Sequence, residues 1–183
     1  MMEQMFQNQS YPFYRFGDFF YLSKISEEDW VKYICQRFEL TGKHISEELA
    51  REICLVTDRY FSYVQQLAWF VWLRTADSSE ATSDDVEYGI NCLLDACEPL
   101  FIQQTEDLSA YQMNFLHALA NGVHNGFTQS AMLKDYSLGT AANITRLKKA
   151  LVDKDLIMAT GPRYLEISDP ILTLWLKKRV WRD

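Results

Sequence analysis

The chain has 183 residues, of which 48% are hydrophobic, 14% aromatic and 23% charged, and its formal net charge is −7. This composition excludes a disordered chain, and the length is sufficient to bury a core in one domain or two small ones. The absence of a membrane-spanning run of roughly 20 apolar residues and of a secretory signal predicts a cytoplasmic protein with no membrane partner.

The charge divides unevenly along the chain. Residues 1–105 carry 8 basic and 17 acidic side chains, a net charge of −9, whereas residues 106–183 carry 10 basic and 8 acidic ones, a net charge of +2. This division indicates two modules. Because an acidic surface repels nucleic acid, any nucleic-acid role is expected in the second module.

The first 25 residues resemble neither module. Residues 11–22 are dense in aromatic side chains and are interrupted by Pro12 and Gly17. Such a segment is too apolar for a free tail, since large exposed apolar patches mark contact surfaces. We therefore expect a strand or connector that packs on a partner surface ahead of the first helix.

Helix signals follow between residues 26 and 105. A first helix is expected to run to about Leu40, before Gly42 stops it. A third, over residues 63–75, is hydrophobic nearly all round, which predicts a central and buried position. The last helix runs towards Pro99. Hydroxyl side chains mark the expected starts of the first, second and fourth helices: Ser26, Ser46 and Thr82. Short loops between four helices predict a compact bundle.

The cysteines lie inside these apolar helical patterns: Cys35, Cys54, Cys92 and Cys97. None forms a C-x-x-C pair, and no histidine stands at zinc-finger spacing from them. We expect reduced thiols that pack as small hydrophobic side chains, and no metal site.

The second module shows helical patterns and one hairpin pattern. Two strands are expected to flank a Gly-Pro turn at residues 160–163. Thr128 and Thr140 are the expected N-caps of the second and third helices. The expected elements are helices over 109–120, 128–136, 140–154 and 170–180 and a hairpin over 156–167. Helix, helix-turn-helix and hairpin is the order of a winged helix. The predicted fold is therefore mainly α, with a helical bundle followed by a winged helix that has a small β-hairpin wing.

The helix over residues 140–154 would be the recognition helix. Its apolar residues share one face, which leaves a polar face for solvent or a partner. Cations there would meet phosphates while Asn143 or Thr145 reaches base edges, or the face is an ordinary solvated one. With three cations, the logarithm of the DNA-binding constant would fall with the logarithm of the salt concentration with a slope of only about −3. Such a weak electrostatic interaction means that DNA is not the favoured partner. The candidate contact residues are Asn143, Thr145, Arg146, Lys148 and Lys149 on this helix and Arg163 in the wing.

The cations near the C-terminus are open to two interpretations. They either contact a nucleic acid or complement the dipole of the last helix, and they are Lys177, Lys178, Arg179 and Arg182.

Catalytic signatures are absent from the sequence. The patterns G-x-S-x-G, H-E-x-x-H and G-x-x-x-x-G-K-[ST] do not occur, and the seven glycines are scattered. His117 lies in a packed helix and His124 in a turn, and an enzyme that uses either is the least favoured hypothesis. We expect no catalytic residues, no metal and no cofactor in this chain, and cofactor-binding residues cannot be named.

Several segments together resemble a known family. They are residues 14–22 (YRFGDFFYL) leading into 25–30 (ISEEDW), 63–69 (YVQQLAW), 136–140 (YSLGT) and 169–176 (DPILTLWL). In this order they resemble the C-terminal half of an archaeal and bacterial family of P-loop ATPases within the AAA+ and signal-transducing NTPase group. The resemblance covers essentially the whole chain.

The resemblance implies a particular organisation. In that family an αβα nucleotide-binding core precedes a helical lid and a winged-helix domain. Residues 1–25 would be the exit segment of a missing core, 26–105 the lid and 106–183 the winged helix. ATP and Mg²⁺ would belong to the core of the parent protein, since the family's Walker lysine and Mg²⁺-binding acid have no counterpart here. The missing core would be a partner of this chain.

The chain departs from the family pattern at one turn. In related ATPases a Gly-x-Pro turn of the lid lies against the nucleotide, whereas residues 58–63 read DRYFSY here. Arg59 or Tyr60 would be the residues to approach a nucleotide instead. The residues on the following helix that match the family are expected to be buried packing residues: Gln65, Gln66 and Trp69.

Two hypotheses of different classes follow. The first is a non-catalytic lid and winged-helix region of a P-loop ATPase, which acts in regulation, nucleotide-state sensing or partner docking. The alternative is a free-standing winged-helix transcriptional regulator that binds DNA and uses its acidic helical module to dimerise or to sense a ligand.

Overall fold

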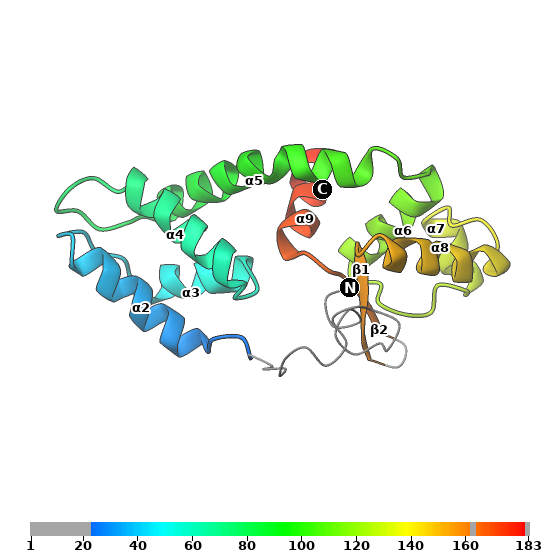
Figure 1. The fold of residues 1–183 in the computed structure, drawn as a ribbon, viewed down its shortest axis with the longest axis horizontal. Coiled ribbons are helices and arrows are strands. Elements are labelled where there is room, and N and C mark those ends of the chain that lie inside the picture. Colours follow the sequence, from blue (N-terminus) through cyan, green and yellow to red (C-terminus); the bar gives the residue numbers. More distant parts are fainter. Residues whose placement is uncertain (1–22, 162–163, 182–183) are drawn as a thin grey trace, which may run out of the picture.

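The computed structural model describes residues 23–161 and 164–181. The aromatic segment over residues 11–22, the exit segment up to residue 22, the wing candidate Arg163 and the C-terminal cation Arg182 lie outside the described residues. Figure 1 shows an elongated molecule with a helical bundle at one end and a winged helix at the other, and helix α5 runs along both.

The bundle begins with helices whose predicted starts are confirmed. The side chains of Ser26 and Ser46 accept hydrogen bonds from backbone amides three residues later, and Thr82 forms a reciprocal capping box with Asp85. Helix α2 packs on α3, and α4 packs on both α3 and α5. The bounds are α2 Glu27–Glu39, α3 Glu47–Val56, α4 Phe61–Arg74 and α5 Ser83–Thr105.

The prediction that the third helix is buried on all sides is wrong. Helix α4 begins at Phe61 and buries fully only the face that carries Val64, Leu67 and Val71. Gln65 is exposed and Trp69 is 53% exposed, so neither is the buried packing residue expected, whereas Gln66 is half-buried. An apolar sequence does not specify how many neighbours a helix finds, and this helix has neighbours on only part of its circumference.

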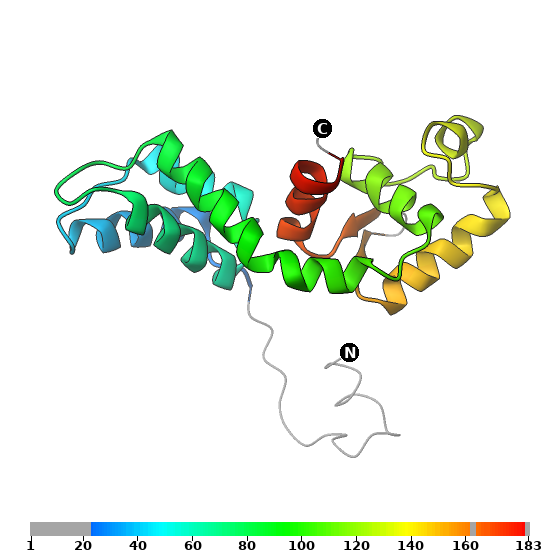
Figure 2. The same cartoon turned by 90° about the horizontal axis from the view of Figure 1, so that it is seen from above.

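The fourth helix does not stop near Pro99, contrary to the prediction. Helix α5 continues through Pro99 to Thr105 and bends along its length (Figure 2). Proline removes one backbone hydrogen bond and bends a helix without necessarily ending it. The packing of Phe101, which is fully buried beyond the proline, offsets the lost bond.

The second half has the predicted winged-helix order. Its strands pair antiparallel, with Met158 opposite Glu166, and the register shifts between Ala159 and Gly161. Helix α9 packs back on α5, so the two ends of the molecule share one continuous core (Figure 1). The bounds are α6 Ala110–Ala120, α7 Ser130–Asp135, α8 Ala141–Asp153, β1 Ile157–Gly161, β2 Tyr164–Ile167, α9 Pro170–Trp175 and a terminal π-helix η1 Leu176–Trp181.

Both threonine caps predicted in this half require correction. Thr128 lies in a turn closed by a hydrogen bond from the Gln129 amide to the Gly126 carbonyl, so α7 begins two residues later than expected. Thr140 holds the N-cap position of α8, but its side chain makes no capping bond. The Asn143 amide donates to the Thr140 carbonyl instead.

The last helix also differs from the prediction. It is α-helical from Pro170 to Trp175 and continues as a π-helix, rather than as one α-helix to residue 180. The Asp169 side chain caps it by accepting from the amides of Ile171 and Leu172. The π-helical segment carries the ion pairs that Lys178 and Arg179 make with α5.

The cysteines differ in burial. All four are free thiols, of which Cys54 is fully buried and the others half-buried.

None of the helices in the described part of the chain combines the length and the apolar character needed to cross a membrane.

We expect iodoacetamide to alkylate Cys54 at least about tenfold more slowly than Cys92 in the folded protein. Burial raises the pKa of the Cys54 thiol to about 11, which lowers the fraction of reactive thiolate. Mass spectrometry of the labelled peptides over time measures both rates. The two rates should converge in denaturant, and equal rates in the folded protein would contradict the prediction.

Candidate functional site

The outward face of α8 gathers most of the candidate contact residues. Ile144, Leu147 and Leu151 are buried and anchor the opposite side of the helix in the core, as predicted. This fixes the rotation of α8, so that the polar side chains point away from the core. Thr145, Arg146 and Lys149 are exposed, and Asn143 is half-buried.

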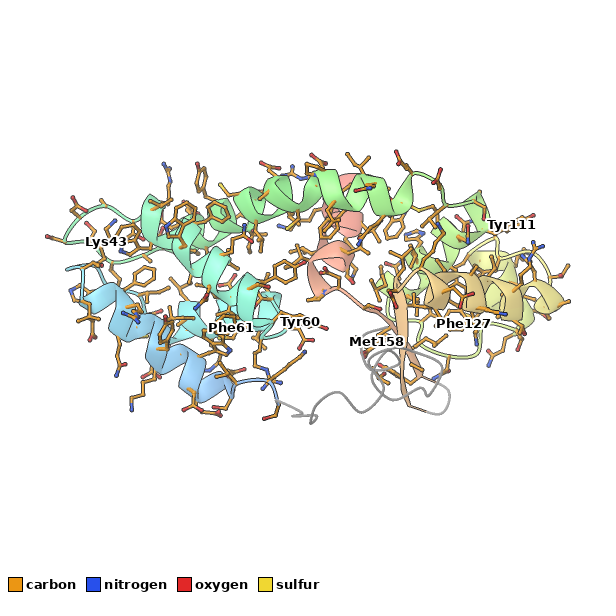
Figure 3. The ribbon with its side chains drawn as sticks, in the orientation of Figure 1. Lys43, Tyr60, Phe61, Tyr111, Phe127 and Met158 are labelled. Atoms are coloured by element: carbon orange, nitrogen blue, oxygen red, sulfur yellow. The ribbon has the colours of Figure 1, made fainter. Side chains whose placement is uncertain are left out.

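Lys148 is set apart from the other cations of this helix. Its side chain is half-buried, and its ammonium lies 5.2 Å from the centroid of the Phe127 ring. Phe127, labelled in Figure 3, is itself buried and stacks on Phe115. A lysine in this arrangement covers apolar surface with its alkyl stem. Of the candidate cations on α8, Arg146 and Lys149 therefore present their charge to solvent, and Asp153 at the end of the helix offsets part of it.

A hollow of about 480 Å³ opens at the N-terminal end of α8. Tyr111 of α6, the Gly139–Thr140 turn, and Asn143 and Arg146 of α8 line it. Gly139 has φ +81°, and a Cβ at this position would lie 3.3 Å from the Tyr111 ring. Glycine suits this turn, because the positive φ disfavours residues with a Cβ and the Tyr111 ring would have to shift to make room for one. The hollow can take a small polar group or a side chain of a partner.

Two of the three histidines, His117 and His124, take structural positions. The His124 ring stacks on Tyr164, with its Nδ1 2.9 Å from the Leu165 carbonyl oxygen, and so fixes the base of the wing. The His117 ring lies 4.4 Å from that of Trp181. Across the described ranges, no group of three or more histidine, cysteine or acidic side chains lies close enough together to hold a metal ion.

Two of the C-terminal cations turn inward to the bundle. Lys178 pairs with Glu87 at 2.7 Å, and Arg179 pairs with Asp95 at 2.8 Å. These ion pairs join η1 to the acidic helix α5. Neither interpretation of the sequence included these pairs, and because they are partly exposed to solvent they add only modestly to the contact between η1 and α5.

The turn at residues 58–63, which differs from the family pattern, lies at the junction between the helical bundle and the winged helix. Asp58 and Arg59 have φ of 45° and 55°, a left-handed conformation that non-glycine residues rarely adopt. The Tyr60 hydroxyl, which was expected to approach a nucleotide, donates to the Ser168 carbonyl at 3.1 Å. Figure 3 shows Tyr60 at the end of the bundle that faces the winged helix.

A second tyrosine strengthens the same connection. The Tyr63 hydroxyl donates to a carboxylate oxygen of Asp169 at 2.6 Å, while the other carboxylate oxygen caps α9. Burial, together with the hydrogen bond to Asp169, raises the pKa of Tyr63. Asp169 is not among the predicted helix caps, although an aspartate directly before Pro170 is a recognisable N-cap signal. No local pattern connects it to Tyr63, which lies 106 positions earlier in the chain.

The order of the helices and the hairpin in the second half of the chain defines a winged-helix module. In agreement, residues 99–178 match the model of a family described as "Probable winged helix domain".

A solved structure, the Walker-type ATPase paby2304 of Pyrococcus abyssi, is similar with a TM-score of 0.65 and 17% sequence identity. The similarity covers 93% of this chain and 47% of that one, so this chain spans about half the length of the ATPase. At this identity the similarity shows the fold alone. No curated protein matches the chain.

Proposed function

We propose that this chain is the lid and winged-helix region of a P-loop ATPase, that it acts in regulation, nucleotide-state sensing or partner docking, and that it catalyses no reaction itself. The observation that carries the proposal is the extent of the fold similarity. It runs through bundle and winged helix, 93% of this chain, while about half of the Walker-type ATPase has no counterpart. The proposal includes a cytoplasmic location, as the sequence predicts.

The junction between bundle and winged helix supports a mechanical role. Tyr60 and Tyr63 of the bundle bond to Ser168 and Asp169, and two ion pairs join η1 to α5. The buried core is continuous across the junction. A bundle held in this way moves together with the winged helix as one body, so that a rotation of the lid would displace the α8 face.

The hollow beside the turn that departs from the family pattern is a poor match for a nucleotide. The polar hollow beside the turn at Asp58 and Arg59 is also lined by Glu27 and Glu28. Two of its three carboxylates are already paired, Asp58 with Lys24 and Glu27 with Arg51, and Arg59 is the lining cation left to meet a triphosphate. One cation beside the carboxylate of Glu28 is a poor match for a triphosphate. ATP and Mg²⁺ therefore belong, in this proposal, to the core domain, which is also the first partner of this chain.

The proposal is tested on the longest reading frame that contains this chain. We expect its product to hydrolyse ATP, whereas the 183-residue chain neither hydrolyses nor binds it. Hydrogen exchange of the full product with and without ATP should show changed protection at the lid. A reading frame without a P-loop, or tight ATP binding by the chain alone, would refute the proposal.

The second candidate function, DNA binding by a free-standing regulator, rests on two exposed cations of α8, Arg146, which lines the hollow, and Lys149. Two exposed cations support a salt slope of only about −2 and a dissociation constant weaker than about 10 μM near physiological salt. Fluorescence anisotropy with a labelled duplex over a series of salt concentrations measures both. Replacing both cations with alanine should bring the slope close to zero. Nanomolar affinity with a steep slope would favour the regulator instead.

A further inference from the structure

Helices α2 and α4 leave an apolar groove between them. It has a volume of about 340 Å³, and Tyr33 and Arg37 of α2 face Gln65, Trp69 and Trp72 of α4 across it. Figure 1 shows both helices at the end of the molecule away from the winged helix. The groove is therefore separate from the α8 face and from the junction with α9.

The floor of the groove is held in place before any partner arrives. The Trp72 indole donates to the Thr41 hydroxyl at 2.8 Å, and the Lys43 ammonium lies 4.3 Å from the centroid of the Trp72 rings. Lys43 is only 6% exposed and donates to the carbonyls of Trp72 and Thr75 at the end of α4. Lys43 is labelled at this end of the bundle in Figure 3. Such preorganisation lowers the entropy that binding must overcome.

An exposed apolar ridge extends the groove along α4. Phe61, Trp69 and Leu73 are 59%, 53% and 51% exposed, and their spacings of eight and four residues place them along one side of the helix. Single exposed apolar residues are ordinary, but a row of them marks an interaction surface. A volume of 340 Å³ accepts one or two side chains, so a small ligand would leave this ridge uncovered. The surface therefore suits a macromolecule.

The charge of this surface selects among partners. Residues 1–105 carry a net charge of −9 from 8 basic and 17 acidic side chains, yet α4 contains no carboxylate and Arg37 is the charged residue that lines the groove. The Arg37 guanidinium lies 5.1 Å from the Tyr33 ring centroid and is exposed beside the groove. A guanidinium in this position pairs well with a carboxylate of a docked segment. Tryptophan, tyrosine and arginine are also the residues that dominate binding energy at interfaces.

We propose that the α2–α4 groove docks an amphipathic, acidic helix of a separate partner protein. Aliphatic side chains of that helix enter the groove and cover the Phe61–Trp69–Leu73 ridge, while a carboxylate pairs with Arg37. A groove between two helices receives a helix through anchors at positions i, i+3 or i+4, and i+7. The proposal is independent of the ATPase assignment, because the surface is the same on a free-standing chain.

Two designed helical peptides with one apolar leucine face test the proposal. They differ only in their polar positions, which are glutamate in one and lysine in the other, and fluorescence anisotropy measures their binding to the full 183-residue chain. We expect the acidic peptide to bind about tenfold or more tightly than the basic one. Arg37→Glu should reverse this preference, and Trp69→Ala should weaken the acidic peptide about tenfold. Because both side chains are exposed, the variants should keep the circular dichroism and melting temperature of the wild type.

Tyr88→Ala is the matched control, since Tyr88 is a half-exposed aromatic residue on α5 and does not line the groove. It should bind both peptides as the wild type does. Equal binding of the two peptides, absence of binding, or an Arg37→Glu variant with unchanged preference overturns the proposal. Protection of Trp69 from hydroxyl radicals in the isolated product of the longest reading frame also overturns it, because the occupant would then be the protein's own core domain.

Discussion

Replacing Trp175 with alanine is expected to lower the free energy of unfolding by about 4 kcal/mol, the largest effect of any substitution considered. Trp175 is 5% exposed, and its ring centroid lies 5.7 Å from that of Phe101 on α5. Its indole N–H also donates to Glu98 at 3.1 Å. The substitution removes the aromatic side chain that joins α9 to α5 and leaves a cavity at the junction.

Chemical denaturation followed by circular dichroism measures this change, which corresponds to a loss of about 10 °C in Tm for a chain of this size. Trp69→Ala is the matched control for stability. The same chemical change is made there at a side chain that is 53% exposed, and the expected cost is below about 1 kcal/mol. If both variants unfolded at the same denaturant concentration, the junction would not contribute as the packing indicates.

The second large effect is expected at Asp169. Alanine at this position removes the N-cap of α9 and the acceptor of the Tyr63 hydroxyl, and the two losses together should cost about 3 kcal/mol. Asp169→Asn keeps a good capping side chain but removes the charge, so it should cost less. Tyr63→Phe removes only the hydroxyl. Denaturation of these variants and of the double variant Tyr63→Phe with Asp169→Asn gives the coupling energy of the pair.

The contribution of Tyr63 to the free energy of unfolding depends on pH. Burial, and then the hydrogen bond to Asp169, raise the pKa of Tyr63 above its ordinary value of 10.0. The folded state therefore retains the phenol proton more strongly than the unfolded state. The contribution is complete below pH 10 and is lost as the pH rises above it. Tyr63→Phe should remove this alkaline loss, and a variant that still shows it, or a coupling energy near zero, would contradict the assigned role.

These substitutions also bear on the proposed function. If the chain is part of an ATPase, as proposed, and lid and winged helix move as one body, a variant that loosens the junction should leave ATP hydrolysis by the full-length protein intact. The same variant should uncouple the winged helix from the nucleotide state. Tyr63→Phe is the mildest such change, because it removes one hydroxyl and leaves the packing in place. The α2–α4 groove lies at the opposite end of the bundle and should be unaffected.

Local signals in the sequence were sufficient for the helices and their order. Ser26, Ser46 and Thr82 cap helices as predicted because an N-cap satisfies amides within three residues of itself. The inward face of α8 follows from the spacing of Ile144, Leu147 and Leu151. The same reasoning was wrong at Thr128 and beyond Pro99, where a turn hydrogen bond and the packing of Phe101 outweighed the local preference.

The sequence by itself thus determined a mainly helical chain, a bundle followed by a winged helix, and the residues of the α8 face. Only the tertiary structure decided which cations face solvent and which apolar residues remain exposed. Lys178 and Arg179 pair with residues 91 and 84 positions away, and Trp69 is exposed because none of the elements between residues 23 and 181 that the structure describes covers that side of α4. Such partners are chosen by how whole helices pack. Short-range periodicity and capping carry no information about contacts between residues that far apart in the chain.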